Sequence, residues 1–148
     1  MTAALFVDAD GCPVTDIAIR LAEKHHIPCT LLCDTAHQID RPNARTIIVS
    51  KGPDSVDFAL VNLLHSGDVV VTQDYGLAAM CLSRGAIPIR QDGLVYTADN
   101  MDALLTFRAA ASRIRRGGGR LKGPHRRTAQ EDQTFWAALD SLLRKCCP

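Results

Sequence analysis

Short apolar runs alternate with longer amphipathic stretches through the first 90 positions of the chain. The runs are rich in β-branched residues and predict five strands, at 4–7, 28–32, 46–49, 69–72 and 86–89. Helices are predicted between them, at 14–24, 54–64 and 77–84. Pro13 suits the first helical position, and Gly67 and Gly85 follow helix ends. Because the runs lack polar alternation, we expect strands buried on both faces.

Alternating strands and helices predict an α/β fold in which a central parallel sheet is flanked by helices. The expected strand order is 3-2-1-4-5. After position 89 the pattern changes to one further extended piece at 94–97 and two helices, at 100–115 and 129–145. The 148 residues, 47% of them hydrophobic, fit a single domain. We therefore expect one domain over 1–148, with an α/β core at 1–98 and a helical extension at 99–148 that carries a basic loop at 113–127.

Three aspartates follow strands of the predicted sheet. Asp8 ends the first run, Asp10 comes two residues later, and Asp74 follows the fourth run by two residues. In the expected order, the first and fourth strands flank the point where strand order reverses. Ligands of open α/β sheets bind at that point, outside the carboxyl ends of the strands. The sequence therefore predicts that these carboxylates converge there.

A fourth aspartate, Asp57, lies inside an unusually apolar predicted helix. We expect that helix to be largely buried, and an unpaired buried carboxylate costs several kcal/mol. There is no lysine or arginine between Gly52 and Ala79, so a cation from solution is a natural partner. Carboxylates without histidine or cysteine favour Mg²⁺ or Mn²⁺ over zinc. One aspartate alone is more often a turn or helix cap, but the joint pattern indicates a metal site whose candidate ligands are Asp8, Asp10, Asp57 and Asp74.

Basic residues gather in one segment although the net charge is only +1. Positions 103–130 hold no acidic residue and eight of the 17 Lys and Arg side chains. The candidate phosphate contacts are Arg113, Arg115, Arg116, Arg120, Lys122, Arg126 and Arg127, with Arg108 upstream. The alternative is a solvated helix end, where arginines are favourable in any case. Among aromatic residues, Tyr75 is near the acidic edge, where it is either a candidate for stacking on a base or an ordinary surface tyrosine. Phe135 and Trp136 are expected in the core.

The six cysteines include no pair with two-residue spacing, which argues against a structural zinc site. Cys29 and Cys33 lie in an apolar run and are expected to be small core residues. No run of 18 apolar residues predicts a membrane span. A strand pattern begins within four residues of Met1, which leaves no room for a signal peptide. We therefore expect a cytoplasmic protein without a disulfide framework.

Several spaced motifs closely resemble those of the YaiI/YqxD family of small bacterial proteins, over nearly the whole chain. The opening signature is Val7-Asp8-Ala9-Asp10-x-Cys12-Pro13, and the second is Gly52-x-Asp54-x-Val56-Asp57. The third and most specific reads Gly67-Asp68-x-Val70-Val71-Thr72-x-Asp74-x-x-Leu77-Ala78, followed by Gly85-Ala86, Tyr96-Thr97 and Gly123-Pro124. One departure is Gln133, where the family usually has arginine, so any contact of that arginine is in doubt.

The family is grouped with PIN-like domains, so the resemblance implies a PIN-like three-layer fold and metal-dependent cleavage of RNA or DNA. By position, Asp8 and Asp74 correspond to the core metal ligands and catalytic carboxylates. Asp57 matches the acidic residue of the intervening helix, and Asp10 is an extra carboxylate of the family motif. The first hypothesis is therefore a Mg²⁺- or Mn²⁺-dependent nuclease, acting as an endoribonuclease. Because a fold does not fix a function, the second is a non-catalytic binder of RNA or a ribonucleoprotein.

A third hypothesis comes from the segment Phe6–Gly11, which also resembles the nucleophile motif of haloacid-dehalogenase-type phosphatases. In that class Asp8 would be phosphorylated and Asp10 would act as acid and base, with Thr72 in the second motif. Two features argue against it. No acidic pair follows a later strand, and Cys12 stands where serine or threonine is expected.

Overall fold

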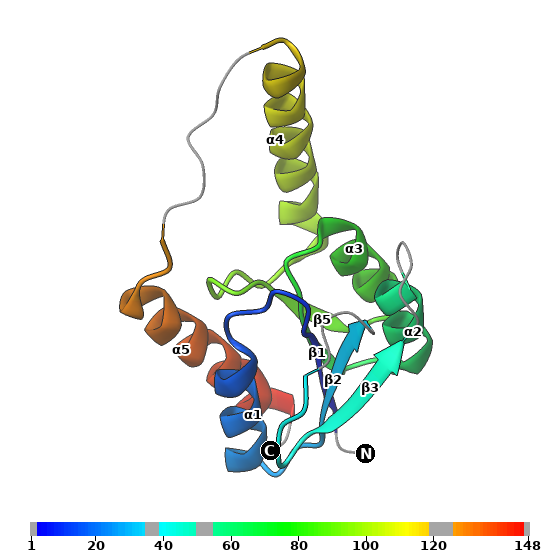
Figure 1. Cartoon of the computed structure of the whole chain (residues 1–148), viewed down its shortest axis with the longest axis vertical. Helices are drawn as coiled ribbons and strands as arrows, with labels where there is room; N and C mark the ends of the chain where they lie inside the picture. The colour runs from blue at the N-terminus through cyan, green and yellow to red at the C-terminus, as the bar shows by residue number, and fades with distance from the viewer. Residues whose placement is uncertain (1–2, 35–38, 50–54, 119–125, 147–148) are drawn as a thin grey trace.

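The computed structural model describes residues 3–34, 39–49, 55–118 and 126–146. Its elements, in chain order, are β1 (Leu5–Asp8), α1 (Thr15–Lys24), β2 (Cys29–Asp34), β3 (Arg45–Val49), α2 (Ser55–Leu63), β4 (Val69–Val71), α3 (Tyr75–Ser83), β5 (Ile87–Ile89), α4 (Ala98–Arg116) and α5 (Ala129–Cys146). The strands form one sheet in the order β3-β2-β1-β4-β5, and every neighbouring pair is parallel (Figure 1). The predicted strand order is therefore confirmed.

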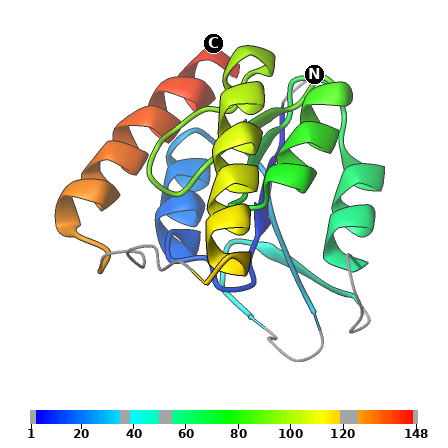
Figure 2. The ribbon, with the colours of Figure 1, turned by 90° about the horizontal axis from the view of Figure 1, so that it is seen from above.

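Helices cover both faces of the sheet because consecutive strand residues point to opposite sides. Leu5 and Val7 face a layer made by α1 and α5, whereas Phe6 faces α2 and α3. Figure 2 shows these helix pairs on opposite sides of the strands. Cys29 and Cys33 are buried, which confirms them as core residues. The result is the three-layer α/β arrangement that the alternation of elements predicts.

Burial differs between the centre and the edge of the sheet. All residues of β4 and the first three of β1 are buried, as predicted. The edge strand β3 is not, and Ile48 is 47% exposed. The expectation of a largely buried α2 was also wrong, because Phe58 is 61% and Leu63 37% exposed. Periodicity reports how apolar a segment is, but not which side of it the remaining chain covers.

The C-terminal helices pack on different sides of the core. α4 begins with a capping box between Thr97 and Asn100 and packs mainly on α3. α5 packs against α1 and inserts Phe135 and Leu139 into the core. The prediction that Trp136 lies in the core was wrong, because this side chain is 36% exposed on the outer side of α5. No helix within the described ranges is long and apolar enough to cross a membrane.

Segment 94–97 is only partly the extended piece expected from the sequence. Val95 forms one isolated antiparallel bridge with Ile89. Tyr96 is 1% exposed and donates its hydroxyl to the Thr72 carbonyl at 3.3 Å. This segment therefore connects the sheet to α4 and places a buried tyrosine behind the end of β4.

Candidate functional site

A cleft of about 410 Å³ opens at the carboxyl ends of β1 and β4. Asp8 lies at the end of β1, Asp10 in the loop that follows, and Asp74 at the start of α3. All three line the cleft. Asp74 also caps α3, because its Oδ1 accepts the Leu77 N–H at 3.1 Å. The structure therefore brings together three of the four predicted carboxylates at the switch point of the sheet.

Thr72 fixes the relative positions of two of these aspartates. Its hydroxyl donates to Asp8 Oδ2 at 2.9 Å and accepts the Asp74 N–H at 3.0 Å. Thr72 is itself 2% exposed, with its carbonyl bonded by the Tyr96 hydroxyl. One buried side chain thus holds Asp8 and the start of α3 together on the cleft wall.

Burial and like charge act together on Asp8. Desolvation raises its pKa from 3.8 to about 6, the hydrogen bond from Thr72 opposes that rise, and the charges of Asp10 and Asp74 add to it. A carboxylate with a raised pKa gains from a proton or a cation nearby. The cleft is therefore electrostatically suited to a positively charged ligand, and such perturbed groups gather at functional sites.

Asp10 connects the cleft to the neighbouring strand. Its carboxylate accepts the Asp34 N–H, with oxygen distances of 3.3 and 3.4 Å. Asp34 ends β2, so the carboxyl ends of β1 and β2 and the loop after β4 all present aspartates. The sequence analysis missed Asp34, although it follows an apolar run in the same way as Asp8 does.

Asp57 lies on α2, partly buried, and does not line the cleft. Burial raises the pKa of the Cys81 thiol to about 12, and the charges of both Asp57 and Asp8 contribute to that rise. The two aspartates therefore act on the same buried thiol from different elements. A direct role of Asp57 as ligand or catalytic carboxylate stays a prediction.

Whether a metal ion fits the cleft depends on how many carboxylate ligands that ion requires. Among the residues that the structure describes, no three His, Cys, Asp or Glu side chains are grouped closely enough to hold an ion together. A preassembled shell of four carboxylates is thus not seen in the described part of the chain. Mg²⁺ fits the donors nonetheless, because it commonly binds through one or two carboxylates and keeps several waters.

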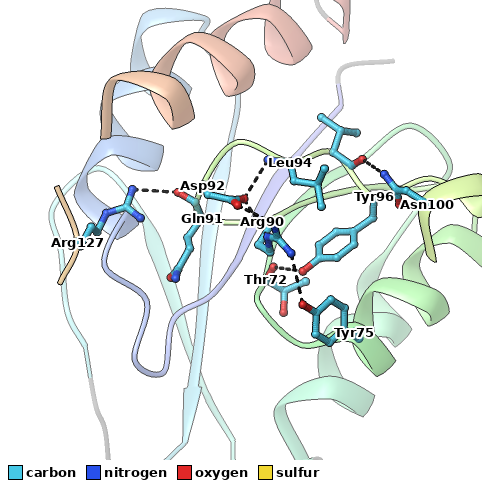
Figure 3. A network of polar contacts seen from close by, with 10 residues as sticks. Thr72, Tyr75, Arg90, Gln91, Asp92, Leu94, Tyr96, Asn100 and Arg127 are labelled. Atoms are coloured by element: carbon cyan, nitrogen blue, oxygen red, sulfur yellow. Dashed lines mark hydrogen bonds and ion pairs between the residues drawn. The ribbon is translucent and has the colours of Figure 1, made fainter. Parts of the chain in front are cut away.

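The loop after β5 is held by a network of hydrogen bonds and contributes Gln91 to the lining of the cleft (Figure 3). Arg90 donates to both oxygens of Asp92, at 2.9 and 2.6 Å, and to the Tyr75 hydroxyl at 3.3 Å. The Gln91 carbonyl accepts from Arg127 Nη2 at 2.9 Å. The Gln91 side chain lines the cleft, and its Oε1 is buried without a hydrogen-bond partner among the described residues. Sequence reasoning missed Gln91, which follows the last strand without any motif.

The predicted phosphate-contacting residues divide into three groups. Arg113, Arg115 and Arg116 are exposed in the last turns of α4, and Arg126 is exposed before α5. Arg120 and Lys122 lie outside the described residues. Arg127 differs from the first group because its side chain is only 20% exposed and donates to Asp132 at 2.7 Å. Its described contacts hold the Gln91 loop against α5.

Tyr75 is already in contact with other side chains. The Arg108 guanidinium lies 5.5 Å from the centre of its ring. Tyr96 meets the same ring edge to face, with centroids 6.0 Å apart. These contacts leave less of the ring open for base stacking than its position after Asp74 suggested.

Comparison with known proteins gives a family but no activity. The family model described as "Uncharacterized BCR, YaiI/YqxD family" matches residues 6–145. A UPF0178 protein of Exiguobacterium sibiricum is 51% identical over 139 residues, covering 94% of this chain and 95% of the relative. Another, of Clostridium acetobutylicum, is 48% identical over 143 residues, covering 95% and 97%. No solved structure matches. The chain belongs to the uncharacterised bacterial YaiI/YqxD (UPF0178) family.

Proposed function

We propose that this protein is a Mg²⁺- or Mn²⁺-dependent phosphodiesterase that cleaves RNA or another nucleic acid. The observation that carries the proposal is the meeting of Asp8, Asp10 and Asp74 around one cleft at the switch point of the sheet. The raised pKa of Asp8 supports it, because the charged form of this carboxylate is poorly compensated by the protein. The sheet order is compatible with the PIN-like fold that the family resemblance implies.

The residues of the cleft would have distinct tasks in such an enzyme. Asp8 and Asp74 are the ligands we assign to the ion, with Asp10 in reach of its waters. A bound ion would polarise the scissile phosphate and supply activated water. Thr72 holds one oxygen of Asp8 in place, and we assign the other oxygen to the ion. Gln91, which also lines the cleft, offers a neutral polar group to the substrate.

The exposed arginines support a polyanionic substrate. Arg113, Arg115 and Arg116 lie together at the end of α4, and Arg126 follows further along the chain. No acidic residue lies between positions 103 and 130 to neutralise them. Contacts of this kind with phosphates bind nucleic acid without reading its sequence and weaken steeply with salt.

Isothermal titration with Mn²⁺ tests the metal site directly. We expect the wild type to bind, and Asp8→Asn and Asp74→Asn each to weaken binding about tenfold or more, as loss of a metal ligand does. Asp40→Asn, at an exposed position that does not line the cleft, is the matched control and should bind as the wild type does. A wild type that binds no Mn²⁺, or ligand variants that bind equally well, would refute the metal site.

One observation favours a second candidate, the non-catalytic RNA or ribonucleoprotein binder. Within the described residues, no three carboxylates are grouped closely enough to hold a metal ion. The acidic edge is therefore also compatible with a protein that does not cleave RNA. This candidate predicts salt-sensitive RNA binding that needs the exposed arginines but no metal. RNA cleavage that requires Mn²⁺ and Asp8 supports the nuclease, whereas binding alone supports the second candidate. Capture of Asp8 as a beryllofluoride adduct would instead support the haloacid-dehalogenase-type phosphatase.

A further inference from the structure

One face of α4 is apolar and uncovered. Phe107 is 72% and Ile114 46% exposed. Together with Ala103 and Ala110 they follow spacings of four, three and four residues, which place all four on one side of a helix. We call these four residues the α4 seam. The face that α4 presents to the rest of the molecule is a different one, where Met101 and Leu104 pack near Ala78 and Tyr96.

Charge is distributed unequally along the same helix. Its first turns carry Asp99 and Asp102, whereas its second half carries Arg108, Arg113, Arg115 and Arg116. All six side chains are exposed. This gradient stabilises the helix through its dipole, and it also makes α4 complementary to itself. Two parallel copies would bring arginines together, whereas two antiparallel copies bring the acidic half of one against the basic half of the other.

We propose that the α4 seam is a homodimer interface, in which α4 pairs antiparallel with α4 of a second copy around a two-fold axis. The two-fold axis would pass between Phe107 and Ala110, so that Phe107 packs on the partner's Ala110. Small residues opposite large ones let two helices approach closely. Asp102 and Arg113 lie on the same flank of the seam, and an antiparallel two-fold brings that flank against itself. Asp102 therefore faces the partner's Arg113.

The shape of the molecule and its total charge permit this pairing. Figure 1 shows α4 rising away from the sheet layers, so that a second helix can approach it. The net charge of +1 gives two copies little reason to repel each other. The chain's own segment 119–125, which lies outside the described residues, offers Leu121 as its one large apolar side chain. A second α4 can bury both Phe107 and Ile114, which makes it the better occupant.

Sedimentation velocity and light scattering on the full chain test the dimer. We expect a wild-type mass twice that of one chain, and monomers for Phe107→Asp and Ile114→Asp with unchanged circular dichroism. A buried aromatic at an interface centre is commonly worth a roughly 30-fold change in dissociation constant. Phe58→Asp is the matched control, because Phe58 is 61% exposed on α2 and should leave the dimer intact.

Charge reversal tests the antiparallel register. Asp102→Arg and Arg113→Asp should each weaken the dimer severalfold, and the double variant should recover most of the loss because the pairing is restored with opposite signs. A wild type that is monomeric at every concentration overturns the proposal. So does a Phe107→Asp variant that loses RNA binding while the mass stays that of the wild type, since the seam would then be a nucleic-acid surface. These masses do not depend on metal or on cleavage, so failure here leaves the proposed function untouched.

Discussion

The two ends of the sheet each hold an aspartate that is mostly buried, and they treat its charge in opposite ways. At the amino end, Asp68 is 5% exposed and accepts the Ala4 N–H at 2.9 Å and the His65 N–H at 2.8 Å. At the carboxyl end, Asp8 accepts one hydroxyl and has Asp10 and Asp74 as neighbours. Asp68 ties the start of β1 to the turn before β4. Asp8 keeps a charge that the protein does little to compensate.

The difference separates a structural carboxylate from a candidate functional one. Asp8 follows an apolar run directly and Asp68 directly precedes one, and each belongs to one of the family's spaced motifs. What distinguishes them is the set of hydrogen-bond donors around each. Two backbone N–H groups satisfy Asp68, whereas burial, with a smaller contribution from the charges of Asp10 and Asp74, raises the pKa of Asp8. Substitutions at these two positions should therefore change stability in opposite directions.

Asp68→Ala should produce the largest change in stability. Removal of its carboxylate leaves two partly buried N–H groups without their acceptor, and we expect the free energy of unfolding to fall by about 2–3 kcal/mol. Urea denaturation measures this loss. Asp68→Asn, which keeps one acceptor oxygen, should lose less. Mn²⁺ affinity should stay that of the wild type, because Asp68 is at the far end of the sheet. A loss under 0.5 kcal/mol would show that the two bonds contribute little.

Asp8→Asn should instead stabilise the metal-free protein at pH 7. The pKa of Asp8 in the folded state is about 6, above its ordinary 3.8. Between these values the folded state binds more protons than the unfolded state, so the free energy of unfolding falls as pH rises through that window. Two pKa units correspond to at most about 3 kcal/mol, and partial exposure reduces the expected gain to about 1–2 kcal/mol.

Denaturation of both proteins in EDTA at several pH values measures this gain. The difference between Asp8→Asn and the wild type should be near zero at about pH 4 and should grow until about pH 7. Asp40→Asn, whose side chain is exposed, should show no such growth. A wild type that is the more stable protein at neutral pH would mean that Asp8 is compensated within the fold, as Asp68 is.

Sequence reasoning predicted that Asp8 and Asp74 meet at one edge of the sheet, because strand ends are readable from apolar runs. Asp8 and Asp74 follow such runs, and parallel strands bring their carboxyl ends to one edge. It did not predict the contacts of Arg127. A count of charges does not show that this side chain donates hydrogen bonds to Asp132 and to the Gln91 carbonyl. The prediction for Trp136 was wrong for a related reason, since periodicity cannot show which side of α5 is covered. In both cases the outcome depends on residues that are distant in sequence and adjacent in the fold.

Gln91→Leu should give the smallest change in stability and the sharpest test of the cleft. The buried Oε1 of Gln91 has no hydrogen-bond partner among the described residues, so replacing the carboxamide with an apolar group should not lower the free energy of unfolding and should raise it by at most about 1 kcal/mol. Mn²⁺ affinity should be unchanged, because Gln91 adds no charge. Mn²⁺-dependent RNA cleavage should fall severalfold if the carboxamide contacts substrate. A stability loss above about 1 kcal/mol would show that Gln91 stabilises the fold, as Asp68 does. Unchanged cleavage would show that Gln91 does not contact the substrate.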